Sequence, residues 1–331
     1  MKFPNRILFF RLSSMGDILL TTPLLRVFKK NYPTAQVHYI TRQKYAEILQ
    51  FNPYIDKLWM VNKSPEEIKS ELPQSFDYFI DLHKNWRSRT FALRYLSATY
   101  RTFPKLNFRK ILLTTCKINL LPQVHIVERY FHALRDFQLT YDYQGLDFFF
   151  PEKFKMELSF APNQYIACVL GGTYQTKKYP VHKWTELIRL LHMPAVLLGG
   201  PDEKQEGDDI VQQTQNTINF CGKLNITESA YYLKHAAVVI THDTGLMHIA
   251  AALRKPIVSI WGNTVPAFGM YPLLPAGYEK FSMLVENTNI SCRPCSKLGY
   301  NHCPKKHFKC MEDIPPQKIA QAALILLSQN A

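Results

Sequence analysis

The segment Ile240–Ala252 carries the clearest chemical signal in the chain, with the sequence ITHDTGLMHIAAA. An apolar run is followed by a polar turn of Asp243, Thr244 and Gly245, which opens a helical run of small residues. The free N–H groups of a helix start favour an anion such as a diphosphate, and glycine allows close backbone approach. His248 lies on the first turns of this helix. A simple helix cap at Asp243 with a packed His248 is the alternative, but it leaves the Thr-Gly-x-x-His pattern unexplained.

A second loop of small residues lies in Arg11–Arg26, with the sequence RLSSMGDILLTTPLLR. Asp17 follows Gly16 just after an apolar run that is typical of a strand. A carboxylate at the end of a strand can remove a proton from an attacking hydroxyl group. It can equally be an acidic residue that the helix dipole favours at a helix start. The residues themselves leave both interpretations open.

Two further segments place polar residues after glycine pairs. Gly171–Pro180 (GGTYQTKKYP) brings Thr173 and Lys177, which suit the neutralisation of phosphate charge, but its spacing is not that of a Walker A loop. Gly199–Glu203 (GGPDE) places carboxylates where they can bond ribose hydroxyls, or where they are ordinary first-turn acids. There is no Asp-x-Asp pair for a nucleotide-bound divalent metal.

Four of the seven cysteines are grouped near the end of the chain, with the spacing C-x2-C-x7-C-x6-C. Four thiolates can hold a structural zinc ion. Disulfides are the second alternative, and reduced loop cysteines are the interpretation we favour, because the spacing fits no zinc pattern and a cytosolic chain disfavours disulfides. The grouped residues are Cys292, Cys295, Cys303 and Cys310.

Positive charge is the main compositional feature. The chain has 40 Lys and Arg against 26 Asp and Glu, a net charge of +14, and it has no acidic residue between Leu82 and Val127. Such a stretch attracts nucleic acid, an anionic membrane surface or a phosphorylated substrate, although a merely soluble basic surface is the simpler alternative. The basic residues of this stretch are Lys84, Arg87, Arg89, Arg94, Arg101, Lys105, Arg109, Lys110 and Lys117.

Short β-rich runs alternate with helical segments along the chain, which indicates βα units and parallel sheets. A chain of 331 residues is long enough for two such domains, joined by a linker at Pro151–Pro162. Ligands of these sheets bind at the carboxyl ends of the strands. The predicted strands are Arg6–Arg11, Val37–Thr41, Lys57–Val61, Asp77–Leu82, Tyr165–Leu170, Ala195–Leu198, Ile218–Cys221, Ala237–Thr241 and Ile257–Trp261. The predicted helices start at Thr22, Lys44, Pro65, Trp86, His125, Val181, Asp202, Thr227, Gly245 and Pro316.

The longest apolar runs are far shorter than the roughly 20 residues of a membrane span. The first of them, Ile7–Phe10, is also too short for a secretory signal. We therefore expect a cytoplasmic protein.

Three motifs together resemble glycosyltransferase family nine, the bacterial heptosyltransferases of lipopolysaccharide core assembly. They are SSMGDILLTTP near the start, TKKYP after the middle and DTGLMHIAAAL later. The late CRPC…CPKKHFKCM segment is similar to a family feature as well. The order and spacing agree over essentially the whole chain.

The resemblance implies an α/β GT-B fold, in which two Rossmann-like, doubly wound parallel-sheet domains face a central cleft. Residues 1–155 would bind the acceptor and residues 156–315 the nucleotide sugar, and the terminal helix in 316–331 would cross back toward the first domain. The implied enzyme is an inverting glycosyltransferase that needs no metal and no cofactor. It would move heptose from ADP-heptose to an anionic glycolipid, the lipopolysaccharide inner core.

The resemblance also assigns roles to residues. Asp17 matches the general base, Lys177 a ligand of the donor phosphates and Thr173 a neighbouring contact. Asp243 matches a donor-sugar contact, and Thr244 and Gly245 match diphosphate contacts, with His248 beside them. Glu203 falls near a ribose-binding acid and Leu224 near the adenine. Two departures are His242, where the family often has a small or apolar residue, and Tyr179, where tryptophan is usual. Arg87, Arg89, Arg94, Arg101 and Lys105 then become candidates for binding the acceptor.

These assignments predict a monomer that acts as a peripheral protein at the cytoplasmic face of the inner membrane. Two alternatives stay open at this point. One is a GT-B transferase that uses another nucleotide sugar on a different surface glycan. The other is a basic nucleic-acid-binding protein, although no recognition motif for nucleic acid is present.

Overall fold

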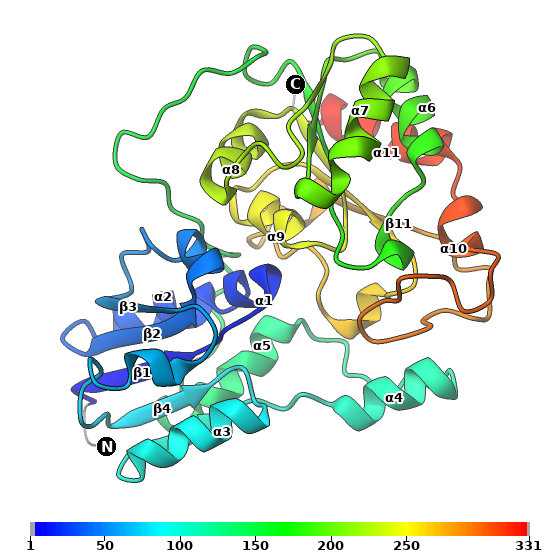
Figure 1. Ribbon diagram of the computed structural model, residues 1–331. Coiled ribbons are helices and arrows are strands. Elements are labelled where there is room, and N and C mark those ends of the chain that lie inside the picture. Colours follow the sequence, from blue (N-terminus) through cyan, green and yellow to red (C-terminus); the bar gives the residue numbers. More distant parts are fainter. Residues whose placement is uncertain (1–3, 330–331) are drawn as a thin grey trace. The chain divides into compact units, whose positions relative to one another are not determined.

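A computed structural model describes residues 4–329 of the chain (Figure 1). The chain forms two compact units. The first unit comprises the residues up to Lys105 together with Val124–Lys153, and the second comprises Leu106–Gln123 and the chain from Phe154 onward. The break at Lys153 lies inside the stretch that the sequence predicts as a linker.

The first unit is built on a five-stranded parallel sheet with the order β3-β2-β1-β4-β5. The central strand β1 is almost wholly buried, which follows from its apolar sequence RILFF and from cover on both faces. The chain order reverses direction between β1 and β4, and this is where ligands of doubly wound sheets bind. The strands are β1 (Arg6–Phe10), β2 (Gln36–Arg42), β3 (Lys57–Val61), β4 (Tyr78–Asp81) and β5 (Thr99–Thr102).

The connections of the first unit are shorter than the sequence predicts. The helices predicted from Lys44 and Pro65 are single 3₁₀ turns, η1 (Gln43–Ile48) and η2 (Pro65–Ile68), and the long ones from Trp86 and His125 each end in a 3₁₀ segment. Strand β5 was not predicted, because its TYRT sequence is short and polar, as half-buried edge strands are. The other elements are α1 (Met15–Leu19), α2 (Thr22–Asn31), α3 (Trp86–Ala92), η3 (Leu93–Tyr95), α5 (Ile126–Phe131) and η4 (His132–Phe137).

The second unit has a six-stranded parallel sheet with the order β11-β10-β9-β6-β7-β8. Its four central strands are buried over their full length, as expected for a sheet with helices on both faces. The order reverses between β6 and β9. The strands are β6 (Ile166–Val169), β7 (Ala195–Leu198), β8 (Thr217–Asn219), β9 (Val238–His242), β10 (Ile257–Trp261) and β11 (Ser282–Glu286).

The helices of the second unit agree with the predicted ones within a few residues. They are α6 (Val181–Leu191), α7 (Lys204–Gln213), α8 (Ile226–His235), α9 (Gly245–Ala252), α10 (Lys309–Glu312) and α11 (Pro316–Ser328). The 3₁₀ turns are η5 (Gln175–Lys177), η6 (Pro201–Glu203), η7 (Pro266–Phe268) and η8 (Glu279–Phe281). The edge strand β11 and the helix α10 were not predicted.

One segment of the predicted N-terminal domain groups with the second unit. The segment Leu106–Gln123, with helix α4 (Asn107–Thr115), groups with the second unit although it lies in the N-terminal half of the chain. Lys117 ties it there by donating to the carbonyl oxygens of Cys292 and Pro294 at 3.0 and 2.8 Å.

The apolar face of the terminal helix α11, with Ile319, Ala323 and Leu326, lies in the core of the second unit. That this helix crosses back toward the first domain stays a prediction. Within residues 4–329, no helix is long and apolar enough to cross a membrane.

Candidate functional site

The candidate donor site lies at the carboxyl edge of the second sheet, where three neighbouring strands end. Strand β6 leads into the loop that holds Lys177, β9 ends just before Asp243, and β10 leads into Thr264. Since β6 and β9 flank the reversal of strand order, this edge is the expected ligand position of a doubly wound sheet.

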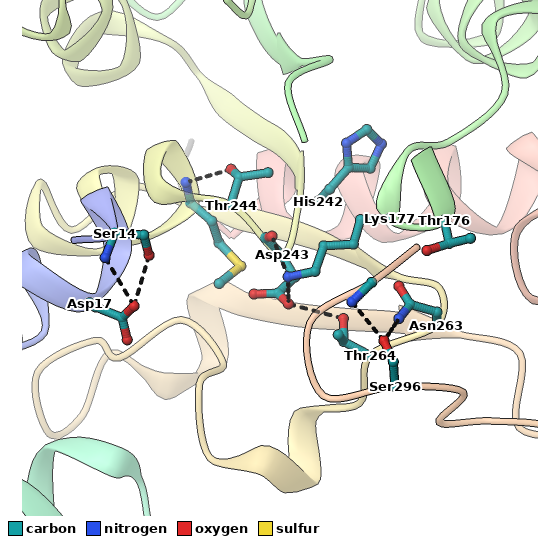
Figure 2. Close-up of polar contacts among 12 residues, drawn as sticks. Ser14, Asp17, Thr176, Lys177, His242, Asp243, Thr244, Asn263, Thr264 and Ser296 are labelled. Carbon is teal, nitrogen blue, oxygen red and sulfur yellow. Dashed lines mark hydrogen bonds and ion pairs between the residues drawn. The ribbon is translucent and has the colours of Figure 1, made fainter. Parts of the chain in front are cut away.

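An ion pair joins the two loops at this edge (Figure 2). The Lys177 Nζ atom lies 2.6 Å from Asp243 Oδ2, and both side chains are largely buried. Thr264 donates its hydroxyl to the same carboxylate oxygen at 2.9 Å. A lysine ammonium has three protons, so Lys177 keeps donor capacity for an anion while it is paired with Asp243.

Helix α9 starts directly after this carboxylate. Thr244 is its N-cap, and the Thr244 hydroxyl accepts from the Met247 N–H at 3.4 Å. Gly245 is the first helical residue, so the backbone N–H groups of the first turn directly follow Asp243, the residue with which Lys177 pairs. A lysine ammonium and a helix N-terminus together favour a diphosphate group.

The buried side chain of His242 links two loops at this edge of the sheet. Its Nε2 atom accepts from the Tyr179 backbone N–H at 2.8 Å, which leaves the ring proton on Nδ1, 3.4 Å from the Gly171 carbonyl oxygen. The ring is fully buried, and burial lowers the pKa of His242 to about 4. His242 is therefore a neutral link between β9 and the loop after β6. It packs edge-on against Trp184, which also contacts Tyr179.

The predicted ribose ligand Glu203 is buried in an ion pair. Its Oε1 atom lies 2.7 Å from Lys178 Nζ, and its Oε2 atom accepts from the Gly200 N–H at 2.8 Å. Burial alone lowers the pKa of Lys178, but the pairing with Glu203 outweighs it and the pKa is raised. The second lysine of the TKKYP motif is thus a structural residue that we did not single out from the sequence.

The other predicted donor residues are spread over the unit. Thr173 is exposed in the loop after β6, and Leu224 is half-buried between β8 and α8. The side chain of His248 is only 2% exposed on α9, so it is a packed residue in this structure. Among the predicted donor residues, the described contacts join Lys177 to Asp243, which Thr244 and Gly245 follow in the chain. The roles of all the predicted donor residues stay predictions.

The Cys-rich segment contributes an arginine to this edge. The buried Arg293 donates to the carbonyl oxygens of Gly262 and Thr264 after β10, and it pairs with Glu286 at 2.8 Å. The segment is also fastened by Thr176, whose hydroxyl donates to the Tyr300 carbonyl at 3.0 Å. Arg293, which holds Thr264 beside Asp243, was missed because the cysteines dominate the CRPC pattern.

The four grouped cysteines carry free thiols. Burial raises the pKa of Cys295 to about 11 and that of Cys310 to about 12. In residues 4–329, no three His, Cys, Asp or Glu side chains are grouped so that they could hold a metal ion. The zinc alternative therefore has no support from the described residues.

The first unit has its own cluster at the reversal of strand order, around Asp17. Asp17 Oδ1 pairs with Arg11 at 2.7 Å, and Oδ2 accepts from the Ser14 hydroxyl at 2.8 Å (Figure 2). Asp17 and Ser14 also form a capping box at the start of α1. The carboxylate is thus a helix cap, and at 21% exposure it is still open to a ligand. Burial raises the pKa of Asp17, but the charge of Arg11 and the Ser14 hydrogen bonds outweigh it, so the pKa is lowered and Asp17 is ionised at neutral pH.

The five predicted acceptor residues differ in their contacts, and Lys105 is the one that lies nearest to the Asp17 cluster in its electrostatics. Lys105 donates to the Lys84 carbonyl at 2.9 Å, and the charges of Arg11, Asp81 and Asp17 act on its ammonium group. Burial and the charge of Arg11 lower the pKa of Lys105. It is therefore the predicted acceptor residue that is electrostatically linked to Asp17.

Arg101 has an acidic partner although its own stretch of sequence, Leu82–Val127, contains no acid. Asp136, which lies outside that stretch, pairs with it at 2.8 Å. Arg87, Arg89 and Arg94 are exposed on α3 and η3.

Comparisons with known proteins define the class. The model of glycosyltransferase family 9 (heptosyltransferase) matches residues 67–303. A curated relative, lipopolysaccharide heptosyltransferase 3 of Escherichia coli K12, is 27% identical over 280 residues, which cover 76% of this chain and 81% of the relative.

Two solved structures support the fold. The glycosyl transferase family 9 protein of Veillonella parvula matches with a TM-score of 0.76 and 19% identity, over 98% of each chain. Escherichia coli heptosyltransferase WaaC, solved with ADP, matches with a TM-score of 0.71 and 22% identity, over 98% of this chain and 100% of WaaC.

The fold and the family match together define a glycosyltransferase of the GT-B class, built on two Rossmann-like parallel-sheet units. The chain belongs to glycosyltransferase family 9, the heptosyltransferase family. This confirms the resemblance drawn from the motifs and sets aside the nucleic-acid-binding alternative.

The buried His242 predicts a pH dependence of stability. An unfolded histidine titrates near 6.5, whereas His242 in the folded chain titrates at about 4, so the unfolded chain binds more protons between these values. Its contribution is complete above pH 6.5 and is lost as the pH falls to 4, by about 3 kcal/mol. His242→Gln, which keeps an acceptor and a donor, should reduce this acid loss in urea titrations at several pH values.

Burial also lowers the pKa values of His38 and His83 to about 4. These two residues therefore leave part of the acid loss of stability in both the wild type and His242→Gln. The control is His182→Gln, because the His182 side chain is 70% exposed. If the free energy of unfolding depends on pH equally in His242→Gln and the wild type, His242 is not a buried neutral residue with a lowered pKa.

Proposed function

We propose that this glycosyltransferase moves heptose from ADP-heptose to the inner core of lipopolysaccharide, with inversion at the anomeric carbon and without a metal. The observation that carries the donor assignment is the cluster of Lys177, Asp243 and Thr264 beside the start of α9. Relatives named as lipopolysaccharide heptosyltransferases support the sugar and the acceptor, and WaaC solved with ADP and with ADP-2-deoxy-2-fluoro heptose supports the nucleotide.

The donor diphosphate would lie between Lys177 and the first turn of α9. The negative charge that grows on the leaving ADP is then stabilised by the ammonium group and by the Thr244 and Gly245 amides. Asp243, which pairs with Lys177, would accept hydrogen bonds from the sugar hydroxyls. Thr173 remains a neighbouring candidate in the loop after β6, as do Glu203 for the ribose, Leu224 for the adenine and His248 for support of α9.

Asp17 would take the proton of the attacking acceptor hydroxyl. Its lowered pKa keeps it ionised, and its fixed bonds to Arg11 and Ser14 hold one orientation. A weak carboxylate base suits a reaction in which the hydroxyl loses its proton late, once bonding to the anomeric carbon has begun. Attack from the face opposite the leaving ADP gives inversion.

Lys105 and the arginines of the same unit are proposed to attract the anionic acceptor. The acceptor is a glycolipid, so we place the enzyme at the cytoplasmic face of the inner membrane, as a peripheral protein and a monomer. The exposed charges act over about 8 Å at physiological salt, which suits capture of a phosphorylated substrate from a membrane surface.

The direct test is transfer from ADP-heptose to lipopolysaccharide that lacks heptose, followed by mass spectrometry of the product. We expect a gain of one heptose, with the opposite anomeric configuration to the donor and with unchanged rate in EDTA. UDP- and GDP-sugars are tested in parallel as control donors. Transfer from one of these and not from ADP-heptose would favour a GT-B transferase for another surface glycan.

Asp17→Asn should lower turnover by about 10²–10⁴-fold, the usual worth of general-base catalysis. Asparagine can keep the contact with Ser14, so ADP affinity and folding should change little. Steady-state kinetics and calorimetry with ADP measure both effects. Ser14→Ala is the matched control, since it removes one hydrogen bond and leaves the carboxylate. Near-wild-type turnover of Asp17→Asn would leave Asp17 as a helix cap only.

Lys177 and Asp243 should separate the two halves of the donor. Lys177→Ala should weaken ADP and ADP-heptose alike, by about 10–100-fold, as expected for a lost charge-assisted hydrogen bond. Asp243→Ala should weaken ADP-heptose more than ADP, because it removes a sugar contact and frees the Lys177 ammonium. Calorimetry with both ligands measures this, with Lys183→Ala as control because Lys183 donates to Ile314 instead. Equal losses of both ligands in both variants would contradict the division of roles.

A further inference from the structure

Helix α3 and the 3₁₀ turn η3 of the first unit present large apolar side chains to solvent. Trp86, Leu93 and Leu96 are 69%, 65% and 83% exposed. Burying such side chains is favourable, and exposed apolar side chains gathered on one element mark a surface for a partner or a membrane. The core does not need these three residues.

The helix has two distinct faces. Ser88, Phe91 and Tyr95 are buried, and the two aromatic residues pack in the apolar cluster on one side of the sheet, beside β4 (Figure 1). Trp86 and Leu93 are seven residues apart, which is two turns, so they share the opposite face. The element is therefore amphipathic, with its second apolar stripe directed away from the unit.

Arginines lie next to this exposed stripe. Arg87, Arg89 and Arg94 are exposed, and none forms an ion pair with an acidic residue among the described contacts. The Arg87 guanidinium lies 5.5 Å from the centre of the Trp86 ring. The stretch from Leu82 to Val127 contains no acid, so the element itself has no negative charge that would repel an anionic surface.

We propose that α3 and η3 dock the first unit on an anionic lipid bilayer, with Trp86, Leu93 and Leu96 in the interface and the three arginines on lipid phosphates. Tryptophan and leucine with flanking arginine are the composition of helices that lie in a membrane interface. A protein groove would satisfy the apolar residues but gives no reason for three exposed arginines without an acidic partner around them, of which Arg94 donates to the Lys69 carbonyl oxygen at 2.8 Å. The proposal deepens the proposed function, whose acceptor is a glycolipid, and leaves Lys105 as the acceptor candidate near Asp17.

The test is co-sedimentation of the full chain with vesicles of phosphatidylglycerol and phosphatidylcholine, against phosphatidylcholine alone. We expect binding to the anionic vesicles and a blue shift of fluorescence that is absent in Trp86→Phe. Trp184 and Trp261 are buried and Trp59 is partly buried against the core, so the exposed Trp86 dominates the change. Leu93→Ser with Leu96→Ser, and Arg87→Glu with Arg94→Glu, should each weaken binding by about tenfold or more.

The matched control is Leu324→Ser with Ile325→Ser on α11, two exposed apolar residues of the second unit that should leave vesicle binding unchanged. Circular dichroism and ADP affinity confirm that each variant is folded. Unchanged vesicle binding in the α3 and η3 variants overturns the proposal. Binding that depends on the arginines without any Trp86 shift also overturns it, because the apolar residues then do not enter the interface.

Failure of the docking proposal and failure of the proposed function can be told apart, because vesicle binding is measured separately from heptose transfer. Wild-type vesicle binding that fails in the variants, together with no transfer from ADP-heptose, would contradict the proposed function and support docking. Transfer to a delipidated soluble acceptor, together with vesicle binding that the variants retain, would support the proposed function and contradict docking through α3 and η3.

Discussion

The ion pair between Lys177 and Asp243 is the interaction on which the donor edge of the second unit depends. It joins the loop after β6 to the end of β9, the two strands between which the sheet order reverses. Thr264 adds the end of β10 to the same carboxylate, and Arg293 holds Thr264 through its carbonyl oxygen. Three segments of the sequence therefore meet at one carboxylate group, and a fourth, with Arg293, is joined to it through Thr264.

Charged and neutral groups have separate tasks at this edge. The neutral His242 and the buried pair of Lys178 with Glu203 fix the loops from inside, where a lone charge would be costly. Lys177, paired with Asp243, keeps donor capacity, and the start of α9 adds the partial positive charge of its amides. In the proposed function, adjacent residues of the TKKYP motif thus divide the work, with Lys178 supporting the loops and Lys177 binding the anion.

The sequence predicts the parallel sheets well, because strands such as Ala195–Leu198 (AVLL) are continuous apolar runs with clear turn residues around them, here Pro194 and Gly199-Gly200. It also predicts which loops hold Asp17, Lys177 and Asp243, since the carboxyl ends of parallel strands share an edge. Long-range partners are not predictable this way. Asp136 neutralises Arg101 and Arg293 reaches Thr264 through tertiary contacts only, and the exposed face of α3 emerges only once Phe91 and Tyr95 are seen to be buried.

A crystal structure of the protein with bound ADP tests the central claim most directly. The account predicts that a diphosphate oxygen lies within hydrogen-bond distance of Lys177 Nζ and of the backbone N–H groups at the start of α9, with Asp243 still beside Lys177. The diphosphate at any other edge of the second sheet, with Lys177 bound to Asp243 alone, would contradict it.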